Sequence, residues 1–105
     1  MSHRVLVEAA LERQKIFQNL GKYLDMLKVT INRLDSSAEV YLFGSVAEGD
    51  YTFSSDVDVL VVTRLDPARM HLELWKSGIK EPFEVHVQSP ESIDPYKRRA
   101  KLVKI

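Results

Sequence analysis

The stretch that decides the fold is VYLFGSVAEGDYTFSSDVDVLVV, residues 40–62. Its first apolar run ends in Gly44-Ser45, and after ten intervening residues Asp56 and Asp58 open a second apolar run. Both runs are short and apolar, which is typical of buried strands. The stretch therefore predicts two strands that carry polar groups where the first strand ends and where the second begins.

The two aspartates are expected to lie side by side. Successive side chains of a strand point to opposite faces, so Asp56 and Asp58 share a face, with their Cα atoms roughly 7 Å apart. Two carboxylates this close disfavour each other's ionisation, and a divalent cation between them removes that penalty. Carboxylate and phosphate oxygens are the ligands that Mg²⁺ takes. The pair therefore predicts a magnesium site.

The Gly-Ser turn has features that suit a phosphate. Gly44 lets the backbone come close to a ligand. A helix beginning at Ser45 would present unpaired N–H groups to an anion, and the Ser45 hydroxyl adds another donor. Ser45 and Glu48 have the spacing of a capping box, which predicts that a helix begins here. A Gly-Ser turn is common by itself, and its spacing to the aspartates is what indicates a phosphate site beside the metal.

A third carboxylate is expected from the strand predicted over residues 83–87. Its alternation places three apolar side chains on one face and Glu84 with His86 on the other. Glu84 is the candidate that completes the metal site, and the alternative is an exposed glutamate of an edge strand. His86 either flanks the metals or is an ordinary half-buried histidine.

The remaining sequence predicts helices around a small sheet. Helical periodicity runs from about Val5 to Leu34, as one helix or as two divided at Gly21. Asp66-Pro67 begins another helix, with Ala68, Leu72 and Trp75 as its inner stripe. The order αβαβαβα predicts an α/β (α+β) domain with a small mixed sheet covered by helices. Its expected parts are a leading helix or helix pair at 1–35, a core at 38–88 with strands at 38–43, 56–63 and 83–87, and C-terminal helices at 90–105, including a basic helix from Lys97 to Lys104.

Composition narrows the function without choosing it. The 105 residues suffice for one domain, and 15 basic residues balance 15 acidic ones, which gives no strong case for nucleic-acid binding. The absence of cysteine excludes disulfides, thiolate zinc sites and thiol catalysis. No signal peptide or membrane-spanning run is recognisable, so a cytoplasmic protein is expected.

Gly44, Ser45, the ten-residue gap, Asp56 and Asp58 resemble the signature of the DNA polymerase β-like nucleotidyltransferase superfamily. The short chain is similar to its minimal nucleotidyltransferases, of the type associated with helical HEPN proteins. The resemblance implies that Asp56, Asp58 and Glu84 are catalytic and hold two Mg²⁺ ions. It also implies that Gly44 and Ser45 bind the β- and γ-phosphates of a nucleoside triphosphate.

The activity implied by this resemblance is transfer of a nucleoside monophosphate to a hydroxyl, with release of pyrophosphate. AMP from ATP is the expected group, and the acceptor is expected on a HEPN-type partner protein or on another polymer, with this chain as the antitoxin of a toxin–antitoxin pair. A homodimer is a further option, because apolar residues near the N-terminus could serve a dimer or a partner.

One departure from the family pattern leaves an alternative open. Members commonly carry Arg where Glu48 stands, and a negative charge there would weaken triphosphate binding. A capping-box bond would in addition occupy the Ser45 hydroxyl. The alternative is a non-catalytic antitoxin subunit that keeps the fold and binds a nucleotide or a partner.

Overall fold

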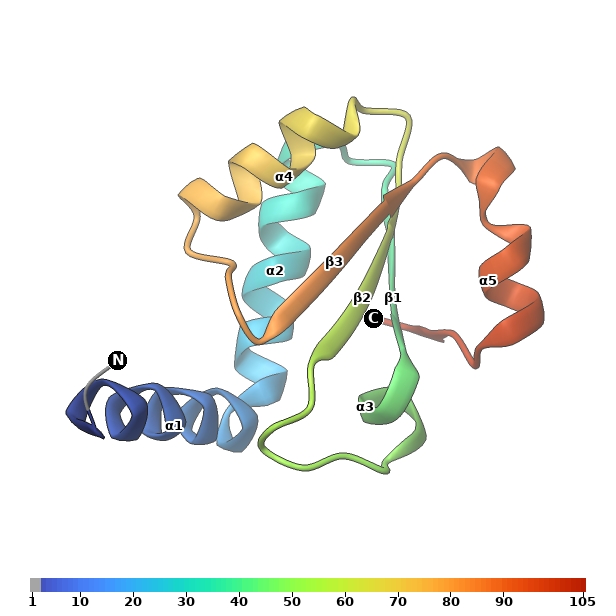
Figure 1. Ribbon diagram of the computed structural model, residues 1–105. Helices are drawn as coiled ribbons and strands as arrows, with labels where there is room; N and C mark the ends of the chain where they lie inside the picture. The colour runs from blue at the N-terminus through green and yellow to red at the C-terminus, as the bar shows by residue number, and fades with distance from the viewer. Residues whose placement is uncertain (1–2) are drawn as a thin grey trace.

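In the computed structural model, which describes residues 3–105, the chain forms a four-stranded sheet with helices on both faces (Figure 1). The predicted strands are confirmed to within one residue at each end. The elements are α1 (His3–Gln18), α2 (Leu20–Leu34), β1 (Glu39–Phe43), α3 (Gly44–Glu48), β2 (Val57–Val62), α4 (Pro67–Lys76), β3 (Phe83–Gln88), a 3₁₀ turn η1 (Pro90–Ser92), α5 (Asp94–Arg99) and β4 (Val103–Lys104).

The sheet is mixed, as expected. Its strand order is β3-β2-β1-β4, with β2 and β3 parallel and β1 antiparallel to both β2 and β4. The register sets Phe43 opposite Asp58, and Asp58 opposite Glu84. Paired residues project to the same face, so these three side chains form one row across the sheet.

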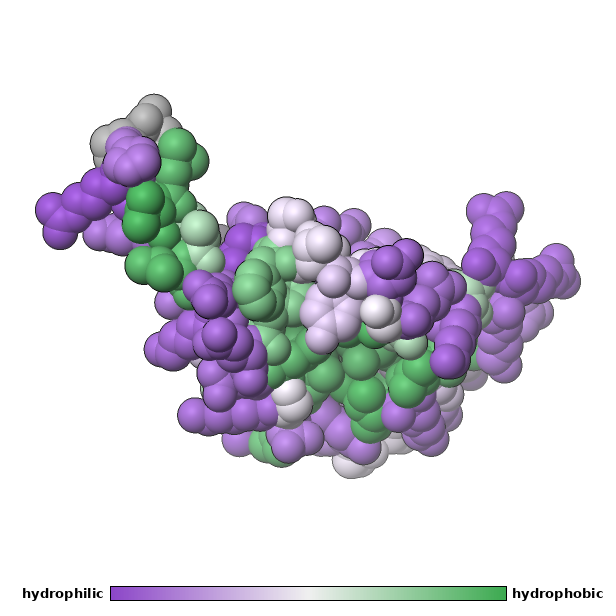
Figure 2. Space-filling view, turned by 90° about the horizontal axis from the view of Figure 1, so that it is seen from below, coloured by the Kyte–Doolittle hydropathy of each residue, from purple (hydrophilic) through white to green (hydrophobic). Residues whose placement is uncertain are grey.

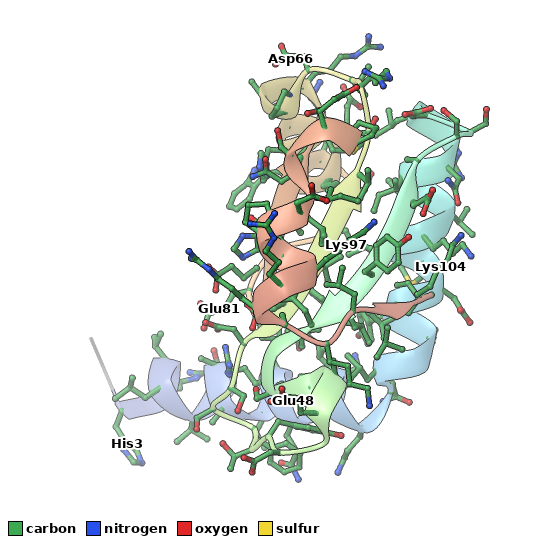
Figure 3. All side chains as sticks on the ribbon, turned by 90° about the vertical axis from the view of Figure 1, so that its right-hand side faces the viewer. His3, Glu48, Asp66, Glu81, Lys97 and Lys104 are labelled. Carbon is green, nitrogen blue, oxygen red and sulfur yellow. The ribbon has the colours of Figure 1, made fainter. Side chains whose placement is uncertain are left out.

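Helices α2 and α4 cover one face of the sheet and enclose the core. The opposite face carries the row of Phe43, Asp58 and Glu84, and α5 lies over it; Figure 3 shows α5 in front of the sheet and α2 behind. Burial of aliphatic side chains from both helices and from the strands drives this layering. The core includes Leu27, Ile31, Val40, Leu42, Val57, Val59, Val61, Met70, Leu74 and Val87.

The N-terminal helical region divides in two at Asn19, and not at Gly21. The Asn19 side-chain amide donates a hydrogen bond to the carbonyl of Lys15 at 2.8 Å, and its φ and ψ of −123° and 31° leave the helical range. An asparagine side chain that bonds to the backbone competes with the helical pattern, whereas Gly21 is accommodated inside α2. Helix α1 therefore points away from the body of the molecule (Figure 1).

The predicted inner stripe of α4 is wrong. Leu72 and Trp75 are exposed, whereas Met70 and Leu74 are buried against the core. Met70 and Leu74 are four residues apart and share a helix face. Leu72 is two residues from each of them and is therefore turned by about 200° from both. The indole of Trp75 instead lies under the ammonium group of Lys80, at 4.2 Å from the ring centre.

The predicted basic helix from Lys97 to Lys104 is also wrong beyond Arg99. Ala100 is extended, and Val103 and Lys104 pair with β1 as β4. This pairing satisfies the backbone at the free edge of β1. It also packs Val103 and Ile105 against the core, which a helical continuation of the basic stretch would forgo.

Candidate functional site

Gly44 connects β1 directly to α3. Its φ of 73° lies in the left-handed region, and a Cβ at this position would overlap Oδ2 of Asp58 and lie 3.2 Å from its Cγ. A side chain at position 44 would therefore fill the space that the Asp58 carboxylate occupies. The glycine is required both by the backbone turn and by the close approach of this carboxylate.

The capping box predicted at Ser45 is wrong. Helix α3 begins at Gly44, so Phe43 occupies the N-cap position in place of Ser45. No side-chain capping hydrogen bond is present at the N-terminus of α3 among the residues that the structure describes. Glu48 is exposed at the end of α3 and therefore does not occupy the Ser45 hydroxyl through a capping bond. Gly49 then ends the helix in a left-handed conformation, as expected.

Asp58 is half-buried on β2 with another carboxylate as its neighbour. Burial raises the pKa of the Asp58 carboxyl above its ordinary value, and the negative charge of Glu84 raises it further. His86 acts in the opposite direction, and Asp56 adds another increase. A carboxylate in this environment is stabilised by a cation, because a cation offsets both the burial and the repulsion.

Three side chains converge at this end of β2 and β3. One oxygen or nitrogen ligand atom from each of Asp58, Glu84 and His86 lies within 4.8 Å of the others. Nε2 of His86 is 3.6 Å from Oε1 of Glu84. Two carboxylates and an imidazole are a donor set that divalent cations accept, so the residues present fit a divalent cation.

Asp56 lies apart from this group of three ligand atoms. Its carboxylate is 56% exposed, and its Oδ1 is 3.9 Å from Nη2 of Arg13. Of the three predicted metal ligands, the structure thus brings Asp58 and Glu84 together and places Asp56 beside a cation of α1.

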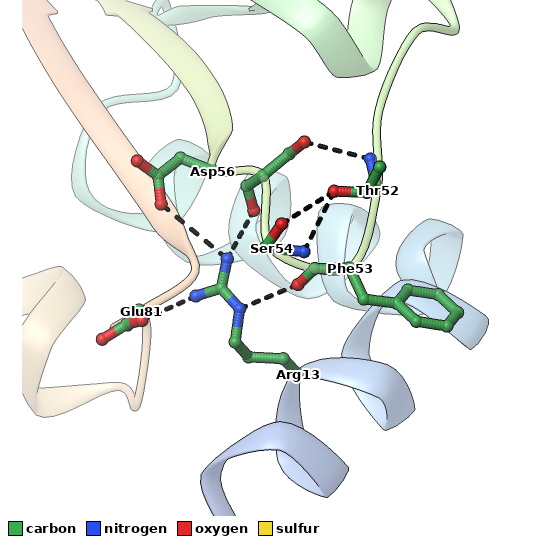
Figure 4. A network of polar contacts seen from close by, with 7 residues as sticks. Arg13, Thr52, Phe53, Ser54, Asp56 and Glu81 are labelled. Carbon is green, nitrogen blue, oxygen red and sulfur yellow. Dashed lines mark hydrogen bonds and ion pairs between the residues drawn. The ribbon is translucent and has the colours of Figure 1, made fainter. Parts of the chain in front are cut away.

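Arg13 is a site residue that the sequence interpretation missed. It donates to the carbonyls of Phe53 at 2.9 Å and Ser55 at 2.5 Å, and to Oε1 of Glu81 at 2.6 Å (Figure 4). Its side chain is only 17% exposed. A signal was available, because Arg13 lies three and four residues before the buried Ile16 and Phe17 and so shares their helix face.

The loop that precedes Asp56 rests on the junction of α1 and α2. The rings of Tyr51 and Phe53 pack on Phe17, with centroid distances of 5.5 and 6.0 Å. Thr52 and Ser55 bond to each other through a backbone N–H and a hydroxyl at 3.0 Å. The loop is thereby held from one side by aromatic packing and from the other by Arg13.

A known protein family matches the part of the chain that forms the sheet and carries the candidate site. The family model described as "Nucleotidyltransferase domain" matches residues 24–104, which include every predicted site residue and exclude α1. No match was found among curated proteins or among solved structures. The mixed α+β fold with its four-stranded sheet is consistent with a polymerase β-like nucleotidyltransferase core.

Within residues 3–105, none of the helices combines the length and apolarity needed to cross a membrane.

Proposed function

The chain belongs to the nucleotidyltransferase domain family, and we propose that it is a metal-dependent nucleotidyltransferase that moves AMP from ATP to a hydroxyl. The observation that carries the proposal is the approach of Asp58 and Glu84 to each other beside Gly44, inside the matched region. A fold with no use for a cation would gain nothing from placing two carboxylates in this position.

We assign two Mg²⁺ ions to Asp56, Asp58 and Glu84. When bound, such ions lower the pKa of an acceptor hydroxyl and neutralise the charge of a triphosphate and of the leaving pyrophosphate. Asp56 is exposed and lies two residues before Asp58, so its carboxylate is accessible to the same metal ions. In the structure this carboxylate is paired with Arg13 at 3.9 Å, a contact that it would exchange for the metal.

The side chains have distinct tasks in the proposed reaction. Gly44 and Ser45 bind the β- and γ-phosphates, and the Ser45 hydroxyl is available because the capping bond is not formed. The acceptor oxygen forms a bond to the α-phosphorus, the bond from that phosphorus to the β-phosphate oxygen breaks, and pyrophosphate leaves. Glu84 accepts the proton of the hydroxyl, directly or through water.

We place the acceptor hydroxyl on a partner protein of the helical HEPN type, with this chain as the antitoxin, or on another polymer. Helix α1 supports a protein partner: it lies outside the family match, and Leu6 and Leu11 on it are 55% and 59% exposed. Figure 2 shows this apolar surface on the part of the molecule that projects from the body. Exposed apolar surface of this kind marks contact sites.

The second candidate is a non-catalytic antitoxin subunit with the same fold. Glu48 favours it, since an exposed negative charge at the end of α3 opposes a triphosphate at the start of that short helix. The convergence of Asp58 and Glu84 argues against this candidate, because a site without a metal has no use for two adjacent carboxylates.

Calorimetric titration of ATP, with and without Mg²⁺, tests the proposal on the wild type, on Asp58→Asn and on Asp25→Asn. Asp25 is exposed on α2 and is a matched control for the same chemical change. We expect Mg²⁺-dependent binding that only Asp58→Asn abolishes. Transfer of labelled AMP from α-labelled ATP to the partner protein then separates the two candidates. A non-catalytic subunit would bind ATP without labelling the partner. Absence of binding by the wild type would contradict the first proposal.

A further inference from the structure

His86 is held in a fixed orientation beside the two carboxylates. Its Nδ1 lies 3.2 Å from the hydroxyl of Tyr96, which comes from α5. The rings of Phe43 and Tyr96 contact the imidazole edge-on, with centroid distances of 5.0 and 5.9 Å. The other ring nitrogen, Nε2, faces Glu84 at 3.6 Å. Packing and the hydrogen bond at Nδ1 thus determine where Nε2 points.

This arrangement differs from an ordinary ion pair between His86 and Glu84. A separation of 3.6 Å is too long for a hydrogen bond, and a charged pair that bonds directly is found at about 2.8 Å. Metal-binding histidines commonly use one ring nitrogen as the ligand, while the other bonds to a neighbouring polar group that fixes the tautomer. The hydroxyl of Tyr96 supplies such a group when Nδ1 carries the proton.

We propose that Nε2 of His86 is a ligand of the cation held by Asp58 and Glu84, and that this position prefers Mn²⁺ to Mg²⁺. The proposal rests on the proposed metal-dependent function and replaces Mg²⁺ with Mn²⁺ at one of its two positions. Mg²⁺ takes oxygen ligands almost exclusively, whereas imidazole favours first-row transition ions. Mn²⁺ resembles Mg²⁺ in binding carboxylate oxygens and, as a first-row transition ion, accepts an imidazole nitrogen more readily.

Electron paramagnetic resonance with MnCl₂ tests the proposal directly. Titration gives the Mn²⁺ affinity, competition with MgCl₂ gives the preference, and pulsed measurements detect the ¹⁴N nucleus of a coordinating imidazole. We expect ¹⁴N coupling in the wild type, and about tenfold weaker Mn²⁺ binding without that coupling in His86→Gln. The Mg²⁺ affinity of His86→Gln should change much less. His71→Gln, on the exposed side of α4, is the matched control and should retain both properties.

Tyr96→Phe examines the orienting hydrogen bond. It keeps the ring that packs on His86 and removes the hydroxyl, so we expect weaker Mn²⁺ binding with the ¹⁴N coupling altered and with the Mg²⁺ affinity unchanged. A merely structural role of Tyr96 would lower thermal stability and leave the Mn²⁺ preference as it is.

The outcomes separate this proposal from the proposed function. Mn²⁺ binding without ¹⁴N coupling, and unaffected in His86→Gln, would overturn the role of His86 while leaving a carboxylate metal site in place. Failure of the wild type to bind either ion would overturn both. Because the ¹⁴N measurement is made on the wild type, the result does not depend on whether a variant folds.

Discussion

At the scale of single residues, Gly44 and Gly49 share a positive φ, but only Gly44 lies against a residue of the candidate site. Comparing the two positions distinguishes an effect on backbone strain from an effect on the site. Gly44 and Gly49 have φ values of 73° and 76°. A Cβ at Gly44 would overlap the Asp58 carboxylate, whereas a Cβ at Gly49 would meet nothing within 4 Å among the described residues. Alanine at either position incurs a backbone penalty of about 1 kcal/mol.

We therefore predict that Gly44→Ala loses cation binding and Gly49→Ala retains it. Both variants should lose free energy of unfolding, and Gly44→Ala should lose more because Asp58 must move. Urea unfolding measures the first effect, and titration with Mn²⁺ measures the second. Equal metal affinity in the two variants would show that the position of Asp58 beside Gly44 is irrelevant to the site.

At the scale of secondary-structure elements, Arg13 connects α1 to the loop before β2. It donates two hydrogen bonds to this loop, to the carbonyls of Phe53 and Ser55, and a third to Glu81 in the segment before β3. In Arg13→Gln we expect a loss of about 2 kcal/mol in the stability of the loop, because carbonyls and a carboxylate lose a charged donor. Hydrogen exchange at residues 53–56 should accelerate, while exchange within β2 stays slow.

Arg4→Gln is the matched control on the same helix. Arg4 pairs only with Glu8 among the contacts described, and its side chain is 88% exposed, so its removal should leave the loop unchanged. Unaltered exchange of the loop in Arg13→Gln would mean that aromatic packing on Phe17 alone positions Asp56.

Asp35 joins the end of α2 to the end of β2. Its carboxylate accepts hydrogen bonds from the hydroxyl of Thr63 and from the hydroxyl and N–H of Ser37. The bond from Thr63 contributes most to holding the pKa of Asp35 below its ordinary value, and those from Ser37 add to it. A carboxyl whose pKa is lower in the folded state stabilises the fold above its unfolded pKa, and this contribution disappears as the pH falls through the folded pKa.

The predicted consequence is an acid-dependent difference between Asp35→Asn and the wild type. At neutral pH we expect the variant to be less stable by about 1 kcal/mol. This difference should shrink as the pH falls below about 4. Urea unfolding over a pH series measures it, with Asp25→Asn as a control that shows no such trend. A difference that is constant with pH would locate the effect in packing and not in the charge.

At the scale of the whole molecule, local spacing explains what could be predicted from the sequence. Strand and turn patterns placed β1, β2 and β3, and the parallel register of β2 and β3 brings Asp58 and Glu84 together as expected. The pairing of Arg13 with the loop and of β4 with β1 joins residues 40 or more positions apart. Such contacts depend on how elements dock, which spacing along the chain does not reveal. The orientation of His86 by Tyr96 depends on α5 in the same way.

The same view of the whole molecule distinguishes apolar residues that the fold uses from those that it leaves at the surface. Leu27 is completely buried between α2 and the sheet, whereas Leu11 on the projecting α1 is 59% exposed. Leu27→Ala should lower the free energy of unfolding by about 3 kcal/mol, through lost burial and a cavity. Leu11→Ala, the same chemical change, should alter it by less than about 0.5 kcal/mol. Urea unfolding of the two variants checks both values. A large loss in Leu11→Ala would mean that α1 packs within the fold or within an assembly of this chain in solution, whereas a negligible loss leaves its apolar surface available to the proposed partner.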